Sequence, residues 1–125
     1  MANPNIVNVA SIYGTTTYLT PANTAAQVLL SNAASSGFLY KINQIVAANV
    51  NGASAVNATV SINNAASGGG TAFPIVSTVS VPASASLIVV DKTTAIYLME
   101  NSSIVVTSGT ANGISYTLSY ESISV

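Results

Sequence analysis

Five charged side chains are the groups in this chain that could do acid–base chemistry. They are Lys41, Asp91, Lys92, Glu100 and Glu121, and they make up 4% of the 125 residues. Two carboxylates can share general acid and base work when they lie close together, but the spacing of these three indicates no pair. The chain has no His and no Cys, so neither a Ser-His-Asp nor a Cys-His unit can form. The sequence therefore predicts no catalytic residue and no enzyme.

Cofactor, metal and nucleic-acid sites are not expected either. Zinc is held mainly by Cys and His, which the chain lacks. The run Gly68-Gly69-Gly70 has no Gly-Lys-Ser/Thr ending and so does not match a phosphate-binding loop. The acidic residues and the asparagines permit a calcium site, but nothing in their spacing indicates one. Two lysines are too few to form the basic patch that binds nucleic acid.

The composition indicates that the charged residues are positioned by β-strands and the turns between them. Val, Ile and Thr account for 39 residues, and such β-branched side chains favour a pleated sheet over a helix. Ser, Thr and Asn account for 44 residues, so uncharged groups supply most of the polar surface. These three residue types favour turns, caps and sheet faces over helix interiors.

Nine strand-like segments follow one another at short spacing, separated by Gly, Pro, Asn and Ser. They cover residues 6–13, 26–31, 38–46, 56–63, 75–81, 87–91, 95–99, 104–107 and 114–121. The fold class that fits is an all-β, antiparallel β-sandwich of eight to ten short strands, with a jelly roll as one arrangement of them. We expect a single domain over residues 1–125, in which residues 1–14 form an N-terminal arm or the first strand.

Local patterns add detail to three of these segments. In the third segment Phe38, Tyr40, Ile42 and Val46 are expected to share one face and Lys41 and Asn43 the other, and Gln44 breaks the alternation in a way that a β-bulge would explain. Asn112-Gly113 is a tight-turn signal that predicts a hairpin between the last two strands. The glycine run at 68–70 predicts a flexible loop.

No membrane partner is expected. The N-terminus has neither the cationic region nor the apolar region of a signal peptide, and apolar runs such as Leu87–Val90 are too short to span a bilayer. We therefore expect synthesis in the cytoplasm.

The low charge predicts a self-associating protein. Free monomers usually protect their sheet edges with lysines and other charges, which are nearly absent here. A closed homo-oligomer would cover such edges, and an uncharged surface of hydroxyls and amides would also fit. Among the tyrosines, Tyr40, Tyr116 and Tyr120 lie on apolar strand faces and are expected in the core. The candidate interface residues are Ile6, Val7, Val9, Ile12, Tyr13, Tyr18 and Tyr97.

Several stretches are similar to small virion structural proteins of tailed bacteriophages, especially those that infect cyanobacteria. The similar stretches are Met1–Gly14, Ser31–Gly37, Tyr40–Asn43, Ala48–Gly52, Val79–Ala83, Leu87–Lys92, Ile96–Glu100, Ser103–Thr107 and Tyr116–Ile123. They cover most of the chain as strand and turn patterns. The departures are the Ala-, Gly- and Asn-rich segment 51–73 and the weakly acidic turn Met99–Ser102.

This resemblance implies a capsid decoration (cement) protein on the virion surface. Its implied partners are the major capsid protein and itself, as a homotrimer that binds between capsid subunits. Tail, neck, baseplate and fibre locations fit the same resemblance. A glycan-binding β-sandwich is a further alternative, which the tyrosines suggest and the absence of Trp weakens. The resemblance carries no catalytic residue and no cofactor.

Overall fold

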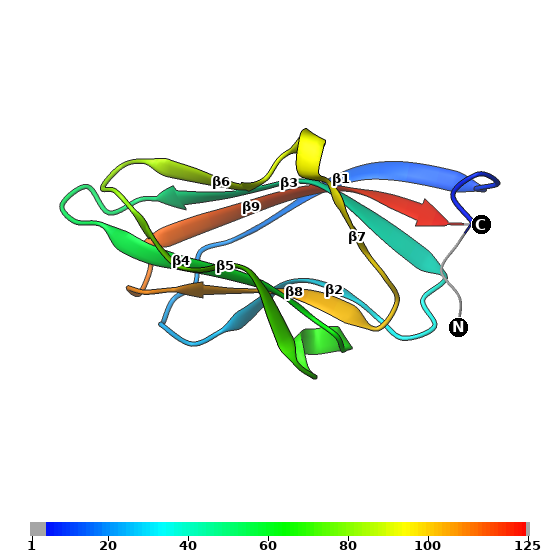
Figure 1. Cartoon of the computed structure of the whole chain (residues 1–125), viewed down its shortest axis with the longest axis horizontal. Helices are drawn as coiled ribbons and strands as arrows, with labels where there is room; N and C mark the ends of the chain where they lie inside the picture. The colour runs from blue at the N-terminus through cyan, green and yellow to red at the C-terminus, as the bar shows by residue number, and fades with distance from the viewer. Residues whose placement is uncertain (1–4, 125) are drawn as a thin grey trace.

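Two antiparallel sheets face each other in the computed structural model, which describes residues 5–124 (Figure 1). One sheet contains β1 (Ser11–Leu19), β9 (Ile114–Ser124), β3 (Phe38–Asn49), β6 (Ser86–Val90) and β7 (Ile96–Leu98). The other contains β2 (Gln27–Asn32), β8 (Ser102–Ser108), β4 (Val56–Asn63) and β5 (Ala72–Val81). Two short 3₁₀ turns complete the description, η1 (Ala66–Gly68) and η2 (Lys92–Thr94). Each of the nine strands overlaps a segment predicted from the sequence.

The strand order is that of a jelly roll. The first sheet has the order β1-β9-β3-β6, the second has the order β2-β8-β4-β5, and β7 also pairs with β3. Because β6 and β7 pair with successive parts of β3 and are separated only by η2, they occupy one edge position. Apart from the β4–β5 hairpin, every connection between these eight strand positions passes from one sheet to the other. The predicted all-β sandwich is confirmed, and the order of its strands matches two Greek keys.

The core lies between the sheets and is built from the inward-facing residues of the four central strands. Ile42, Val60, Ile104, Tyr116 and Leu118 are each fully buried. Their alternation with polar residues is what buries one face of each strand. The three tyrosines expected in the core are found there: Tyr116 is buried, and Tyr40 and Tyr120 are half-buried with ring centroids 4.9 Å apart.

The bulge predicted at Gln44 is present. After it, the odd-numbered residues of β3, rather than the even-numbered ones, point into the core. The register with β9 shifts between Ile42 and Gln44, so Ile45, rather than Gln44, is the next residue to enter the core. The expectation that Val46 shares the buried face of Ile42 is therefore wrong, because Val46 pairs with the exposed Ile88. The extra residue of the bulge shifts the period-2 alternation by one.

The first strand begins later than the sequence pattern indicated. Residues 5–10 form turns rather than part of a strand, and β1 runs from Ser11 to Leu19. The Asn5 side chain accepts a hydrogen bond from the Val7 N–H at 2.9 Å, and this local turn competes with extension of the strand. Within the stretch expected to be an arm or first strand, residues 1–4 lie outside the described part of the chain.

The hairpin predicted at Asn112-Gly113 is wrong. β8 and β9 lie in different sheets, and the segment between them crosses from one sheet to the other. A type I′ hairpin turn needs positive φ at both central residues. Asn112 has a φ of 55°, whereas Gly113 is not among the residues with positive φ. Backbone hydrogen bonds from Gly109 to Asn57 and from Asn112 to Pro21 fix the crossing instead.

The glycine loop at 68–70 is anchored to the second sheet. The Gly68 N–H donates to the Ser103 hydroxyl at 3.0 Å, and the Ser67 N–H donates to the Ser31 hydroxyl at 2.9 Å. The carbonyls of Gly68 and Gly69 accept hydrogen bonds from the buried Asn63 amide. These bonds place η1 against β2 and β8, so the expectation of a flexible loop does not fit the structure.

Two buried asparagines connect the sheets at opposite ends of the sandwich. The Asn32 amide, at the end of β2, donates to the carbonyls of Phe38 in β3 and Leu98 in β7 at 3.0 and 3.1 Å. The Asn49 amide, at the end of β3, donates to the carbonyl of Val81 in β5 at 2.9 Å. Because a buried carbonyl without a partner costs free energy, each amide bond contributes to the stability of the contact between the sheets.

Replacing Asn32 with leucine, which branches in the same way but can form no hydrogen bond, is expected to lower the free energy of unfolding by roughly 2 to 4 kcal/mol. The substitution would leave two carbonyls and the Ser36 hydroxyl, which donates to the Asn32 side chain, without this partner. Urea unfolding followed by circular dichroism measures the loss. The matched control is Asn57→Leu at an exposed position of β4. Equal losses of unfolding free energy in the two variants would contradict a stabilising role for the hydrogen bonds of the buried Asn32 amide.

Candidate interaction surfaces

The features through which this molecule can contact others are its sheet edges, because every sandwich that does not close into a barrel leaves edge strands. In the described part of the chain these edges are β1 and β6/β7 in one sheet and β2 and β5 in the other. An edge strand presents unpaired N–H and C=O groups that can pair with another chain unless something prevents it.

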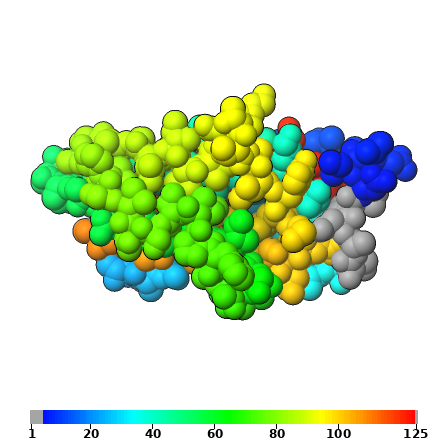
Figure 2. Space-filling model, in the orientation of Figure 1, coloured from blue at the N-terminus to red at the C-terminus, as the bar shows by residue number. Residues whose placement is uncertain are grey.

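Three of the four edges are protected by local structure. β5 contains Pro74, has positive φ at Thr78, and shifts register twice against β4. β2 spans only six residues, shifts register between Val28 and Leu30, and is contacted by η1. The β6/β7 edge is interrupted by η2, which projects from the surface in Figure 2. Proline, bulges and short length are the usual means of preventing edge pairing.

β1 has none of these protections. It runs for nine residues in continuous register with β9, from Ser11 opposite Ser124 to Leu19 opposite Tyr116. Its sequence, SIYGTTTYL, contains no proline and no charge. Six of its nine residues are exposed, and no heavy atom lies within 4 Å of the position that a Cβ of Gly14 would take. β1 is therefore the edge most open to strand pairing.

The candidate interface residues fall mainly on β1 and the turns before it. The exposed fractions are 49% for Ile6, 90% for Val7, 54% for Ile12, 65% for Tyr13 and 76% for Tyr18, whereas Val9 is half-buried. Tyr97 lies apart from them on β7 and is 46% exposed. Whether these residues contact a partner stays a prediction.

The sequence interpretation missed several large exposed apolar residues, of which Ile88 is the most exposed among the described residues. Ile88 on β6 is 60% exposed and lies opposite Val46 on the outer face. It occurs in an apolar run, Leu87–Val90, in which no alternation distinguishes the outward residue from its neighbours. Strand pairing, rather than residue type, determines its exposure.

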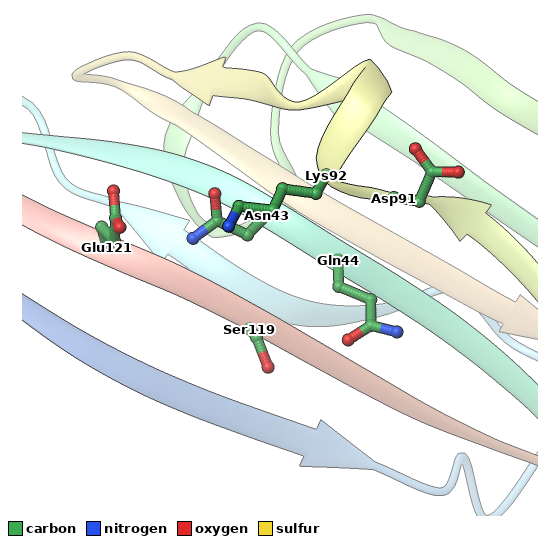
Figure 3. Close-up of a pocket in the computed structure, with 6 residues that line it drawn as sticks. All are labelled: Asn43, Gln44, Asp91, Lys92, Ser119 and Glu121. Atoms are coloured by element: carbon green, nitrogen blue, oxygen red, sulfur yellow. The ribbon is translucent and has the colours of Figure 1, made fainter.

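A polar hollow of about 390 Å³ lies on the outer face beside η2 (Figure 3). Its lining residues are Asn43, Gln44, Asp91, Lys92, Ser119 and Glu121. The hollow thus brings together two of the three carboxylates in the chain, and Figure 3 shows them at opposite ends with Lys92 and Asn43 between. None of the six lining residues is aromatic, so the hollow offers no ring on which a sugar could stack.

The Asp91 carboxylate is engaged in its own turn. It accepts hydrogen bonds from the N–H and the hydroxyl of Thr93, at 2.9 and 2.5 Å, and forms a capping box with Thr94. The Thr93 hydroxyl, followed by the Thr93 N–H, holds the pKa of Asp91 below its usual value. An ionised carboxylate held in this way stabilises η2 rather than transferring protons.

The third carboxylate lies away from the hollow. Glu100 is in the turn between β7 and β8, and its side-chain oxygens are buried. Over residues 5–124 there is no group of three His, Cys, Asp or Glu side chains arranged to hold a metal ion. The same residues include no helix that is long and apolar enough to cross a membrane.

A strongly raised pKa belongs to a residue of the core. Burial raises the pKa of Tyr116 to about 12, with the backbone of Thr59 acting in the opposite direction. Strongly shifted groups often mark functional sites. Tyr116, however, is fully buried and its hydroxyl donates to the Thr107 carbonyl at 2.5 Å, so the shift belongs to the packing of the core.

Known structures share the fold at low sequence identity. A subunit chain of the Helicobacter pylori bacteriophage KHP30 capsid has a TM-score of 0.52 and 10% identity, covering 93% of this chain and 90% of that one. A chain from Bacillus endospore appendages, described as disulfide-linked pili, has a TM-score of 0.50 and 15% identity, covering 92% and 88%. No protein-family model matches the sequence. No curated protein matches it either. The structural likeness shows that this sandwich architecture occurs in both of those assemblies.

The shifted pKa of Tyr116 predicts a loss of stability in alkaline solution. Because the folded-state pKa lies above the ordinary value of 10.0, this residue's contribution is complete below pH 10 and is lost as the pH rises toward 12. In Tyr116→Phe, the urea midpoint should fall less steeply between pH 10 and 12, after an initial loss at pH 7 of about 1 to 2 kcal/mol for the missing hydrogen bond. Part of the decline remains, because burial and Tyr120 also raise the pKa of Tyr40.

The control for this measurement is Tyr18→Phe, since Tyr18 is 76% exposed. Its urea midpoint should follow that of the unmodified protein at every pH. Parallel curves for Tyr116→Phe and the unmodified protein would contradict the assignment of the alkaline loss to Tyr116.

Proposed function

We propose that this protein is a non-enzymatic structural component of a phage virion, and most specifically a capsid decoration protein. In this role it binds the assembled lattice of the major capsid protein as a homo-oligomer on the virion surface. The observation that carries the proposal is an uncharged edge strand without local protection on a jelly roll whose other edges are protected. The core is filled, three edges are protected, and β1 with the preceding turns exposes uncharged apolar residues.

The fold and the chemistry of the surface support the same role. The jelly-roll architecture is shared with a capsid chain of a bacteriophage. The Asp91 carboxylate of the hollow is engaged in a turn, and the lining of the hollow includes no aromatic ring; these two observations disfavour catalysis and glycan binding respectively. The likeness to a pilus chain is one of fold, and this chain has no cysteine with which to form disulfide links between subunits.

The mechanism of a decoration protein is mass action on the assembled shell. A protein that binds only the assembled lattice stabilises that lattice relative to free subunits by RT ln(1 + c/Kd) per site, where c is the concentration of the free decoration protein. Burial of apolar side chains such as Val7 and Tyr18 supplies the binding free energy, because five charges can contribute little.

The count of this chain per virion tests the location. Quantitative mass spectrometry of purified particles should give roughly one chain for each major capsid subunit, since a decoration protein follows the symmetry of the lattice. A count far below the number of capsid subunits would place the protein in the tail, neck, baseplate or fibre instead. Absence from the particle would overturn the virion role and leave a glycan-binding module as the alternative.

Binding to stripped capsids is expected to change little with ionic strength. Salt screens exposed charges over about 8 Å at 0.15 M, but the interface proposed here is apolar. The bound fraction in a sedimentation assay should therefore be nearly constant from low to high NaCl. Asp91→Asn combined with Glu121→Gln removes the two carboxylates of the hollow and should leave binding unchanged. A steep loss of binding with salt, or with this double variant, would contradict an apolar interface.

A further inference from the structure

We propose that the free edge of β1 pairs antiparallel with β1 of a second copy of this chain, about a twofold axis at Thr15. The inference deepens the self-association part of the proposed function and rests on it. Its starting point is the contrast between the four edges. Three are blocked by a proline, bulges or a 3₁₀ turn, whereas β1 offers nine residues in unbroken register.

The sequence of β1 is complementary to itself in this arrangement. Thr15 is the middle residue of the strand, so a twofold axis there overlaps all nine residues. On the outer face Ile12 then lies opposite Tyr18 of the second copy, and Tyr18 lies opposite its Ile12. These two side chains are 54% and 76% exposed in the single chain. Pairs of an aromatic and a β-branched residue are among the stabilising cross-strand pairs of antiparallel sheets.

The remaining pairs in this register also fit. Gly14 lies opposite Thr16, and the open space above Gly14 accommodates the threonine side chain of the second copy. On the inner face Tyr13, which is 65% exposed, lies opposite Thr17. Thr15 lies opposite itself. No pair places like charges together, because β1 carries no charge.

The observations favour a second copy over a different partner. An isologous contact requires one strand to complement itself, and β1 does so in each pair from Ile12 to Tyr18. A twofold contact of this kind joins two chains. The homotrimer implied by the resemblance would therefore have to be formed through another surface, and the β1 contact would link chains of neighbouring trimers.

Two opposite substitutions at Thr15 test the axis directly. In Thr15→Lys, and separately in Thr15→Glu, two like charges meet across the axis. Each variant alone should raise the dissociation constant of the dimer about fivefold or more, as measured by sedimentation velocity over a dilution series. A one-to-one mixture of the two variants should restore association, because Lys then lies opposite Glu. The same pair of substitutions at Thr24, an exposed residue between β1 and β2, is the control.

A cross-link provides an independent measurement. The chain has no cysteine, so Thr15→Cys introduces a single thiol. Residues directly opposite each other in an antiparallel pair have Cα atoms about 4.5 to 5.5 Å apart, within the range that a disulfide spans. Mild oxidation should convert Thr15→Cys to a covalent dimer, and Thr24→Cys should remain monomeric. Circular dichroism of each variant confirms that the fold is retained.

The proposal is overturned by either of two results. One is an unmodified chain that remains monomeric at every concentration tested. The other is a dimer that neither Thr15→Lys nor Thr15→Glu weakens, which would place the contact elsewhere. Both results leave the count per virion unaffected, so failure of the β1 contact and failure of the virion role can be told apart.

Discussion

Hydrogen bonds from buried asparagine amides hold the two sheets of this molecule together at both ends. This jelly roll passes from one sheet to the other at nearly every connection, and buried backbone carbonyls beside such passages need hydrogen-bond partners. Larger charged residues or disulfides often serve such places, but this chain has almost no charge and no cysteine. Asn32 and Asn49 bond carbonyls of strands in the opposite sheet, and these bonds join β2 to β3 and β7 at one end of the sandwich and β3 to β5 at the other.

The same lack of charge determines how the surface can behave. Charges on an edge strand prevent pairing with other chains, so a chain without them must rely on backbone geometry. Proline, bulges and 3₁₀ turns supply that protection on three edges here. Its absence on β1 is consistent with an edge that is covered in the functional state. The contrast between three protected edges and one open edge is thus informative about assembly, whereas the total number of exposed apolar residues is not.

Much of the architecture could be predicted from the sequence because strand alternation and turn residues are local signals. The segment 56–63 was expected with the bounds that the structure shows, and the bulge near Gln44 follows from a single break in the alternation. The sheet to which a strand belongs is not a local property. Asn112-Gly113 therefore suggested a hairpin, although Pro21 and Asn57, far away in sequence, direct that segment across to the other sheet.

The candidate surface could be predicted only in part, because residue type is a local signal whereas the position of a strand at a sheet edge is not. Tyr13 and Tyr18 were identified by residue type, and both are exposed on β1. The strand expected over residues 6–13 begins at Ser11, because the Asn5 side chain favours a turn before it. The β-branched run Thr15–Thr17 after Gly14 was the signal for the true extent of the strand. What no sequence pattern could show is that β1 lies at an edge, since that depends on the pairing of β9 with β3 on its other side.

An uncharged, strand-mediated contact also constrains how such a protein associates. With a formal net charge of −1, long-range attraction to any partner is weak, so encounter is not steered by charge. Specificity must then come from the register of the two paired strands. A shift of one residue would place Tyr18 of the second copy on the face of the joined sheet opposite to Ile12 of the first. The strand provides that register through Gly14, whose missing side chain leaves space opposite Thr16 and nowhere else along β1. Backbone pairing supplies the adhesion, and the position of one glycine selects the alignment.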